Sequence, residues 1–227
     1  INERHEAWGS LARKLAHEIR NPLTPIQLTI DRLREKYSNL LQEKDSENFK
    51  DNLKIINNQI KQIGNLVNEF SDFARMPKPT LRENNLVNLL NENVKLLKEL
   101  DNSIEINLST NSEKIILNSD KEQISRVFLN LIKNSIESIQ QKAENISNFS
   151  KKITIELTEN DGHINLVIVD NGIGFGKFSE NIKDILNPYF TTKKNGTGLG
   201  LSIVNKIIND HNGKIEFIPR NDGAEIK

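Results

Sequence analysis

Two stretches of regularly spaced apolar residues constrain the fold of this chain more than any other feature. In the second stretch, apolar residues recur at alternating steps of four and three, the spacing of helices that pack along one seam. They are Phe49, Leu53, Ile56, Ile60, Ile63, Val67, Phe70 and Ala74. The first stretch repeats this spacing through Leu23, Ile26, Ile30, Leu33 and Tyr37. We expect two helices joined by the polar segment 42–47, with Asp45 or Ser46 as the N-cap of the second helix.

Two such helices form an antiparallel hairpin, which by itself leaves part of both seams uncovered. We therefore expect two chains to pair into a dimeric four-helix bundle. Core packing within a single chain is the alternative explanation of the same spacing. The helical domain spans residues 1–76 and ends at Met76-Pro-Lys-Pro-Thr80. Because two prolines favour an extended and fairly stiff segment, we place a linker at 77–80 and a second domain at 81–227.

The first helix carries a set of polar residues beside its seam, namely His17, Glu18 and Asn21. Pro22 and Pro25 come next within the helical pattern. A proline inside a helix removes a hydrogen bond and costs roughly 3 kcal/mol, so we expect a bend just past His17. A neutral imidazole with a pKa of about 6.5 can attack phosphorus, and Glu18 could hold its second nitrogen or take its proton. A histidine on a helix surface is also common without any function, so this interpretation depends on the motifs of the second domain.

Composition excludes several classes of protein. The chain has 227 residues, enough for two modest domains. Its 31 Lys and Arg balance 31 Asp and Glu, whereas a nucleic-acid binder should carry a basic surplus. The absence of cysteine excludes disulfides and thiolate metal sites. The sequence also contains no run of about 18 apolar residues, so it predicts no membrane span. Because the chain begins at Ile1 and stops within a strand at Lys227, we expect a cytoplasmic piece of a longer protein.

The second domain alternates helical and strand patterns. Its predicted helices span 86–100, 119–142 and 199–210, the middle one opened by the capping box Ser119-Asp-Lys-Glu122. Predicted strands span 104–108, 114–117, 153–158 and 163–169, and Asn160-Asp-Gly162 joins the last two as a hairpin turn. A final hairpin pairs 214–218 with 223–227. We expect one sheet with helices on one face.

Two features of this domain indicate a nucleotide site. Asn130 and Asn134 are four apart and share a helix face, where their amide oxygens could bind Mg²⁺. Asp170-Asn-Gly-Ile-Gly174 comes directly after an apolar strand, so the Asp170 carboxylate could accept a hydrogen bond from the adenine amino group. Each feature also has an ordinary explanation, as a polar helix face and as a plain turn.

Two further features lie in the segment after this turn. In Pro188-Tyr-Phe-Thr-Thr-Lys-Lys194, Phe190 would anchor a lid and Lys193 or Lys194 would reach phosphate, although a charge pair in a loop is usually only solvated. Gly196-Thr-Gly-Leu-Gly-Leu201 opens a helix, and its backbone amides would form an anion site. It is neither a Walker loop, since no Gly-Lys-Ser/Thr comes after it, nor a Rossmann fingerprint, since no strand comes directly before it.

In this order, the motifs resemble the H, N, G1, F and G2 boxes of bacterial two-component sensor histidine kinases. They are His17-Glu-Ile-Arg-Asn-Pro22, Asn130 to Asn134, Asp170-x-Gly-x-Gly174, Phe190 and Gly196-x-Gly-x-Gly200. The longer string after His17, with Arg32-Leu-Arg-Glu-Lys-Tyr37, looks most like the NtrY-type nitrogen-regulation sensors. The resemblance implies a helical hairpin that forms a dimeric four-helix bundle, joined to a Bergerat-type α/β sandwich that binds ATP.

The resemblance also implies an ATP:protein-histidine kinase, with His17, Glu18 and Asn21 as catalytic residues. Its ATP-binding residues would be Asn130, Lys133, Asn134, Asp170, Gly172, Gly174, Phe190, Thr192, Lys193, Gly196, Thr197, Gly198, Leu199 and Gly200. Asn134 would hold Mg²⁺. His17 would pass its phosphoryl group to an aspartate of a response regulator receiver domain, and the Glu18-x-x-Asn21 pattern resembles sensors that also dephosphorylate that partner. The chain would be the cytoplasmic portion of a bacterial inner-membrane sensor, with no nucleic-acid partner and with membrane contact only through segments beyond this sequence.

Two other classes of protein remain as alternatives. Gyrase-like and chaperone ATPases share this type of ATP-binding fold, but they place a glutamate four residues before the metal-binding Asn, and Asn130 in that place is a poor general base. A non-catalytic dimer scaffold, a degenerate kinase, would keep ATP binding without forming phosphohistidine. The histidine hairpin argues against the ATPase class, and no essential motif is visibly missing, which argues against the degenerate kinase.

Overall fold

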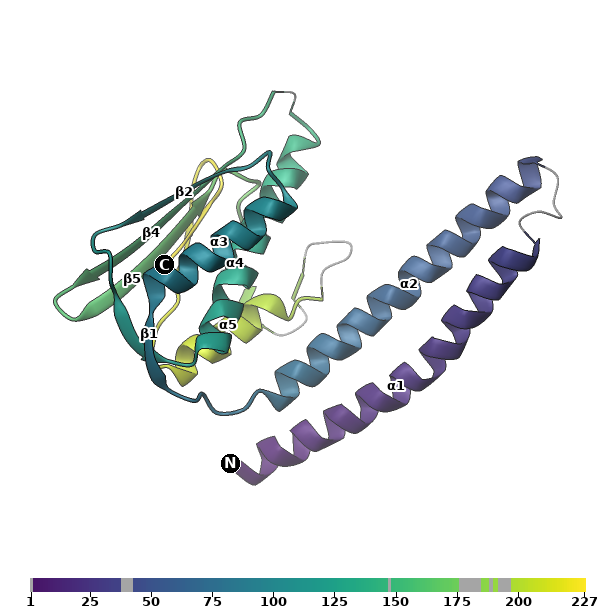
Figure 1. The fold of residues 1–227 in the computed structure, drawn as a ribbon, viewed down its shortest axis with the longest axis horizontal. Helices are drawn as coiled ribbons and strands as arrows, with labels where there is room; N and C mark the ends of the chain where they lie inside the picture. Colours follow the sequence, from purple (N-terminus) through teal and green to yellow (C-terminus); the bar gives the residue numbers. More distant parts are fainter. Residues whose placement is uncertain (1, 38–42, 147, 176–184, 188–189, 192–196) are drawn as a thin grey trace. The chain divides into compact units, whose positions relative to one another are not determined.

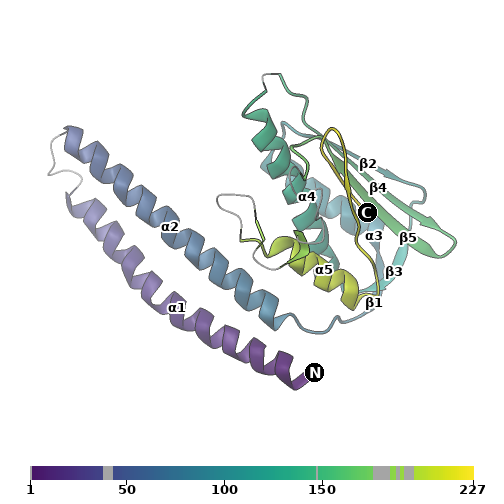
Figure 2. The ribbon, with the colours of Figure 1, turned by 180° about the vertical axis from the view of Figure 1, so that it is seen from behind.

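The computed structural model describes residues 2–37, 43–146, 148–175, 185–187, 190–191 and 197–227. The chain divides into two compact units, Ile1–Pro77 with Thr192–Leu199, and Lys78–Thr191 with Gly200–Lys227. The first unit is built on two long helices, α1 (Asn2–Tyr37) and α2 (Glu43–Arg75). They run side by side in opposite directions in Figures 1 and 2, which confirms the predicted helical hairpin. Because α2 already begins at Glu43, the prediction of an N-cap at Asp45 or Ser46 is wrong.

The hairpin covers only half of each apolar seam. Leu53, Ile60 and Val67 are seven residues apart on α2 and are buried, and Ile30 of α1 packs into the same core. The alternate seam positions stay open within this chain. Exposed large apolar side chains on these positions are Ile19, Ile26 and Leu33 of α1 and Ile56 and Ile63 of α2. Two helices therefore bury one position of each heptad and leave the other for a further partner.

Helix α1 continues through both of its prolines. It runs as one helix from Asn2 to Tyr37 with Pro22 and Pro25 inside it. The expected bend past His17 takes the form of a gradual curvature in Figures 1 and 2. Both prolines are exposed, so water can reach the helix carbonyls that they leave without a donor. The Thr29 hydroxyl donates to the Pro25 carbonyl oxygen over 2.8 Å, a side-chain bond within the same helix.

The second unit is a two-layer α/β sandwich, as predicted. Its five-stranded sheet has the order β2-β4-β5-β7-β6, in which β2 runs parallel to β4 and the other neighbours are antiparallel. The strands are β2 (Glu105–Thr110), β4 (Lys152–Asn160), β5 (His163–Asp170), β6 (Phe217–Pro219) and β7 (Ala224–Ile226). Helices α3 (Leu86–Leu100), α4 (Lys121–Ala143) and α5 (Gly200–Asp210) cover one face, as Figure 1 shows.

The core of this unit lies between the sheet and the helices. Alternate side chains of β4, such as Ile153 and Ile155, are fully buried, whereas Lys152 and Thr154 between them are exposed. Opposite them, α4 contributes Ile132 and Ile139, both fully buried. The period-two pattern of the strand thus decides which face takes the helices.

The prediction of one sheet is wrong, because a second, two-stranded sheet is present. In it, β1 (Arg82–Asn85) pairs antiparallel with β3 (Ile116–Ser119). The sequence prediction placed the second strand at 114–117 and missed β1, whose residues Arg-Glu-Asn-Asn show no apolar alternation. Strand β1 forms through backbone pairing with β3, and its polar side chains show no alternation from which a strand could be predicted.

Both predicted hairpins are confirmed. Asn160 pairs with His163, which leaves Asp161 and Gly162 as a two-residue turn with φ values of 51° and 74°. Two central residues with positive φ are the geometry that suits the twist of the flanking strands. Pro219 pairs with Ala224, so residues 220–223 form the turn of the last hairpin.

Asp120, and not Ser119, is the N-cap of α4. The Asp120 Oδ1 atom accepts from the backbone N–H groups of Glu122 and Gln123, each over 3.1 Å. Ser119 is fully buried as the last residue of β3, where it pairs with Arg82. The capping-box pattern predicted the wrong residue because Ser119 belongs to strand β3, where it pairs with β1.

Asp120 also joins the linker and α5 to the start of α4. Its Oδ2 atom accepts from the Thr80 N–H over 2.9 Å, and its own N–H donates to His211 Nε2 over 3.0 Å. Burial by itself would raise the pKa of the Asp120 carboxyl. The hydrogen bonds from the Thr80, Gln123 and Glu122 N–H groups outweigh burial and hold that pKa below its usual value. The carboxylate form is therefore favoured in the folded domain.

We expect Asp120→Ala to destabilise the ATP-binding domain by about 1–2 kcal/mol, because it removes the helix cap and the Thr80 contact. The measurement is chemical denaturation at pH 7, with Ser119→Ala as the matched control that should cost less. Since the pKa is lowered on folding, the stabilisation is complete above the unfolded value of 3.8 and disappears as the pH falls through the lower folded value. An equal or larger loss for Ser119→Ala would contradict the assignment of the cap.

Candidate functional site: a nucleotide-binding loop and an exposed histidine

A buried carboxylate stands at the centre of the candidate nucleotide site. Asp170, the last residue of β5, is only 4% exposed, and its Oδ1 atom accepts from the Gly172 N–H over 2.9 Å. Burial raises the pKa of this carboxyl. The Gly172 N–H, the Ser135 and Ser138 hydroxyls and the Ala224 N–H favour the ionised form and limit that rise. A carboxylate kept from water in this way is a strong hydrogen-bond acceptor for a ligand.

The loop after Asp170 lies directly on helix α4. The Ile173 N–H donates to Ser138 Oγ over 3.0 Å. A Cβ atom on Gly172 would lie 2.2 Å from Ser138 Oγ and 2.7 Å from the Ser138 carbonyl carbon. Gly174 has a φ of 66°, and a Cβ there would lie 2.5 Å from the Gly223 carbonyl oxygen. Close packing therefore requires glycine at both positions, and at Gly174 the positive φ requires it as well.

The predicted asparagine face of α4 meets the start of α5. Asn130 Nδ2 donates to the Arg126 carbonyl oxygen over 2.9 Å, and a Cβ on Gly200 would lie 3.3 Å from Asn130 Oδ1. Asn134, one turn later, is half-buried. Lys133 is exposed and forms a 3.9 Å ion pair with Glu137. The fold thus places the first asparagine of the N box against the last glycine of the G2 box.

A magnesium site here would depend on amide and ligand oxygens. In the part of the chain that the structure describes, no group of three or more His, Cys, Asp or Glu side chains could hold a metal ion. Mg²⁺ commonly keeps several waters and binds one or two protein oxygens together with substrate phosphates. Ser135 Oγ is buried beside Asp170, where its hydroxyl favours the ionised carboxylate. These residues fit a nucleotide that brings its metal with it.

The structure describes some of the predicted lid residues and not others. Gly198 has a φ of 69°, Leu199 is fully buried, and the Leu199 N–H donates to Thr197 Oγ1 over 3.4 Å. The Phe190 N–H donates to the Asn187 carbonyl oxygen over 3.2 Å, and the Phe190 side chain is half-buried. The predictions for Thr192, Lys193, Lys194 and Gly196 lie outside the described residues.

The predicted phosphoacceptor lies on the helical hairpin. His17, Glu18 and Asn21 of α1 are all exposed, as expected for a histidine beside the seam. Arg20, between them, donates from its guanidinium group to the Asn68 side-chain oxygen on α2. This cross-helix bond was not predicted, because nothing in the local pattern pairs positions that are 48 residues apart.

The loop after Asp170 also contacts three residues that the sequence motifs did not single out, namely Ser138, Lys142 and Ser150. Ser138 could have been found, because it comes after Asn130 and Asn134 at the same four-residue step on α4. Lys142 Nζ donates to the Asn171 carbonyl oxygen, and Asn171 Nδ2 donates to the Ser150 carbonyl oxygen. Only the folded chain shows these two contacts.

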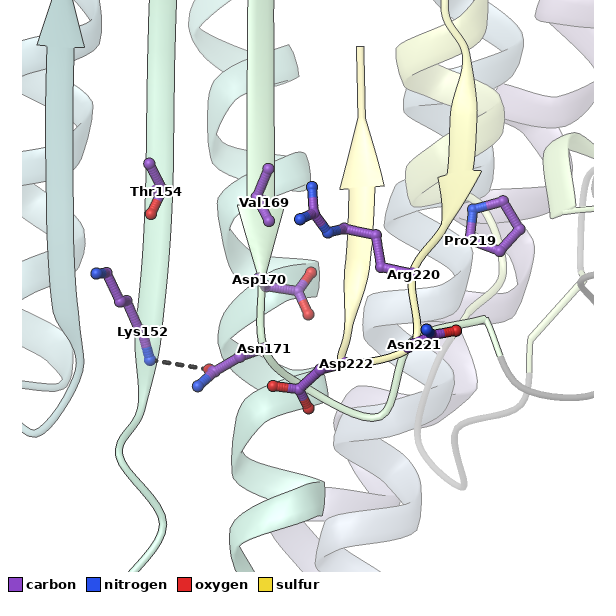
Figure 3. Close-up of a pocket in the computed structure, with 9 residues that line it drawn as sticks. All are labelled: Lys152, Thr154, Val169, Asp170, Asn171, Pro219, Arg220, Asn221 and Asp222. Atoms are coloured by element: carbon purple, nitrogen blue, oxygen red, sulfur yellow. Dashed lines mark hydrogen bonds between the residues drawn. The ribbon is translucent and has the colours of Figure 1, made fainter.

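A cavity of about 520 Å³ lies behind the same loop, on the sheet face away from the helices (Figure 3). It is lined by Lys152, Thr154, Val169, Asp170, Asn171, Pro219, Arg220, Asn221 and Asp222. The exposed strand residues Lys152 and Thr154 mark this as the outer face, whereas the buried neighbours Ile153 and Ile155 face the helices. The cavity therefore opens on the outer face of the sheet and shares Asp170 and Asn171 with the glycine-rich loop.

Comparison with known families identifies the class of protein. The His Kinase A (phospho-acceptor) domain matches residues 7–79, and the histidine kinase-, DNA gyrase B- and HSP90-like ATPase domain matches residues 119–226. The catalytic domain of histidine kinase ThkA is 31% identical, with a TM-score of 0.55 over 64% of this chain and 91% of that chain. The chain belongs to the sensor histidine kinases.

Its similarity extends to the NtrY-like members of this family. The "Putative sensor histidine kinase NtrY-like" of Rickettsia felis is 36% identical over 226 residues, which is 100% of this chain and 36% of that protein. The chain thus spans about a third of the length of this curated relative. ThkA in complex with the response regulator protein TrrA matches 99% of this chain and 62% of that chain, with a TM-score of 0.66 and 29% identity. Among the described residues, no helix is long and apolar enough to cross a membrane.

We expect Gly172→Ala to destabilise the ATP-binding domain by about 3 kcal/mol or to abolish nucleotide binding, because the new methyl group would overlap the backbone of α4. The matched control is Gly162→Ala, at a turn with no atom within 4 Å of the added carbon. Its cost should stay near the roughly 1–2 kcal/mol of a left-handed residue. Thermal unfolding and ATP titration of both variants measure the difference. Normal stability and normal binding in Gly172→Ala would show that the loop does not pack as described.

Proposed function

We propose that this chain is the catalytic core of a sensor histidine kinase, in which His17 takes the γ-phosphoryl group of ATP. The observation that carries this proposal is the buried Asp170 carboxylate, bound by its own glycine loop, which in turn donates to Ser138 of α4. An exposed histidine on a separate helical hairpin supplies the acceptor. We assign residues 1–76 to the phosphoacceptor domain, 77–80 to a linker and 81–227 to the ATP-binding domain.

In this proposal, Asp170 accepts a hydrogen bond from the adenine amino group. The backbone around Gly172 and Gly174 would approach the base, and the amides near Gly198 and Gly200, at the start of α5, would face the phosphates. Asn134 would hold Mg²⁺, which supplies charge neutralisation of the phosphates, with Asn130 beside it. The remaining proposed ATP contacts are Lys133, Phe190, Thr192, Lys193, Gly196, Thr197 and Leu199.

Phosphoryl transfer would result from positioning and charge more than from covalent help. A lone pair of the neutral His17 ring would form the N–P bond while the bond between the γ-phosphorus and the ADP oxygen breaks. Glu18 would take the proton that the second ring nitrogen loses. The ATP-binding domain must approach His17 for this step, and the two prolines of the linker, Pro77 and Pro79, mark where it would turn.

We propose that the working unit is a homodimer. The hairpin leaves alternate heptad positions exposed, among them Ile26, Leu33, Ile56 and Ile63. Exposed apolar side chains in a continuous row indicate a protein interface. Two hairpins that meet through these rows would complete the four-helix bundle that the heptads predict.

The proposed partner is the receiver domain of a response regulator, whose aspartate would take the phosphoryl group from His17. The similarity to ThkA, which was solved in complex with the response regulator protein TrrA, supports this partner. Since the chain covers about a third of its curated relative, we propose that a sensor region belongs to the whole protein and anchors it in the bacterial inner membrane. The core itself would work in the cytoplasm, where ATP is supplied.

His17→Ala should abolish labelling of the protein by γ-labelled ATP and Mg²⁺ while ATP binding persists, because only the nucleophile is lost. The label on the wild type should be acid-labile and alkali-stable, as a phosphoramidate is. His163→Ala is the control, since His163 is also an exposed histidine but lies at the turn between β4 and β5. Free phosphate produced equally by wild type and His17→Ala would instead favour an ATPase of the gyrase or chaperone class.

Asn21→Ala should keep autophosphorylation and reduce dephosphorylation of a phosphorylated response regulator by about a hundredfold, because the amide would orient the attacking water. Release of phosphate from the phospho-regulator, with ADP present, measures this. Thr24→Ala, an exposed change one turn further along α1, is the control. Parallel loss of both activities in Asn21→Ala would contradict a separate phosphatase role.

A further inference from the structure

The side chain of Lys142 reaches from the last turn of α4 to the loop that carries Asp170. Its Nζ atom donates to the Asn171 carbonyl oxygen over 2.8 Å and forms an ion pair with Asp222. The ammonium group also lies 4.9 Å from the centre of the Phe149 ring. The lysine side chain is only 18% exposed, and lysines are rarely buried this far without specific partners. Three separate groups therefore hold this cation at the loop.

Lys142 and Asp170 bind opposite ends of the same peptide group. The carbonyl that Lys142 contacts belongs to the peptide between Asn171 and Gly172, and the N–H of that peptide donates to Asp170 Oδ1 over 2.9 Å. A cation on a carbonyl oxygen polarises the peptide and makes its N–H a stronger donor. The positive charge of Lys142 thus acts on the Asp170 carboxylate through one peptide dipole.

The surroundings keep this peptide in its orientation. Asn171 Oδ1 accepts from the Lys152 N–H over 2.9 Å (dashed in Figure 3), and Asn171 Nδ2 donates to the Ser150 carbonyl oxygen over 2.7 Å. On the other side, a Cβ on Gly223 would lie 1.8 Å from the Asp170 carbonyl oxygen, so the turn of the last hairpin packs against the loop backbone. With both sides held, Lys142 is the charged contribution to an otherwise neutral set of backbone and amide contacts.

We propose that Lys142 is a positioning residue for nucleotide recognition, which turns the Asn171–Gly172 peptide toward Asp170 and keeps that carboxylate an ionised acceptor for the adenine amino group. This inference rests on the proposed function, in which Asp170 reads adenine. Burial alone disfavours the charged Asp170 carboxylate, and the polarised Gly172 N–H would counter this by stabilising the negative charge. Lys142 would act on the base without touching the nucleotide.

The consequence is a role in base selectivity. An ionised Asp170 accepts a hydrogen bond from the 6-amino group of adenine, whereas it repels the 6-oxo group of hypoxanthine. A carboxyl that has lost the support of Lys142 accepts less well, and in its protonated form it can donate to a 6-oxo group. Removal of the lysine charge should therefore weaken ATP binding and leave ITP binding unchanged or stronger.

The test is direct titration of the whole chain with ATP and with ITP, for wild type, Lys142→Met and Lys142→Arg. We expect Lys142→Met to bind ATP roughly tenfold more weakly, as loss of a charge-assisted hydrogen bond would produce, without weaker ITP binding. Lys142→Arg keeps the charge and should restore most of the preference for ATP. Lys152→Met is the matched control, because Lys152 contacts Asn171 through its backbone N–H and its side chain is exposed.

Equal loss of ATP and ITP affinity in Lys142→Met would assign the lysine to general support of the fold and overturn the proposal, as would unchanged ATP affinity. If Lys142→Met does not fold, Asp222→Asn provides a second test, because it removes the countercharge and leaves the ammonium on the carbonyl. The ATP preference should then hold or rise, and a fall would contradict the proposal. Asp170→Asn separates the two levels of inference: wild-type ATP preference in that variant would refute the adenine assignment itself.

Discussion

The ATP-binding unit depends on the burial of one carboxylate at the end of a strand. Asp170 lies under the helical layer, where an isolated charge would be strongly disfavoured. Its own loop returns the Gly172 N–H to the carboxylate, and the loop can do so only because Gly172 has no side chain to strike α4. The local chemistry of the site and the packing of the loop on the helix are therefore one constraint. The same constraint leaves the carboxylate as an acceptor to which a ligand's amino group could donate.

The contacts that hold this loop come from α4 and from the last hairpin. Ser138 of α4 binds the Ile173 N–H, and Gly223 of the last hairpin packs on the Asp170 backbone. Lys142 adds a charge at the Asn171 carbonyl. Because this candidate site is assembled from a helix, a strand end and a distant hairpin, nucleotide binding there would stabilise the folded domain.

The hairpin unit is organised by a different constraint: two helices can bury only half of the apolar positions in each heptad seam. Burial of Leu53 and Ile60 against α1 holds the two helices together. Exposure of Ile56 and Ile63 on the same helix leaves an apolar row that a single hairpin cannot cover. Apolar area exposed in this regular way favours association, so the proposed dimer has its origin in the same periodicity that forms the hairpin.

The sequence by itself determined the periodic elements and the chemical motifs. Heptad spacing predicted the helical hairpin, and alternation of apolar and polar residues predicted β4 and β5. The turn between these strands, with positive φ at Asp161 and Gly162, was predicted from the three residues Asn160-Asp-Gly162 alone. Tertiary structure decided the rest, because those features depend on residues far apart in the chain. Pairing with β3 created β1 from a polar segment and moved the N-cap of α4 from Ser119 to Asp120. The contact of Lys142 with the Asn171 carbonyl joins positions 29 residues apart, and no local pattern records a distance of that kind.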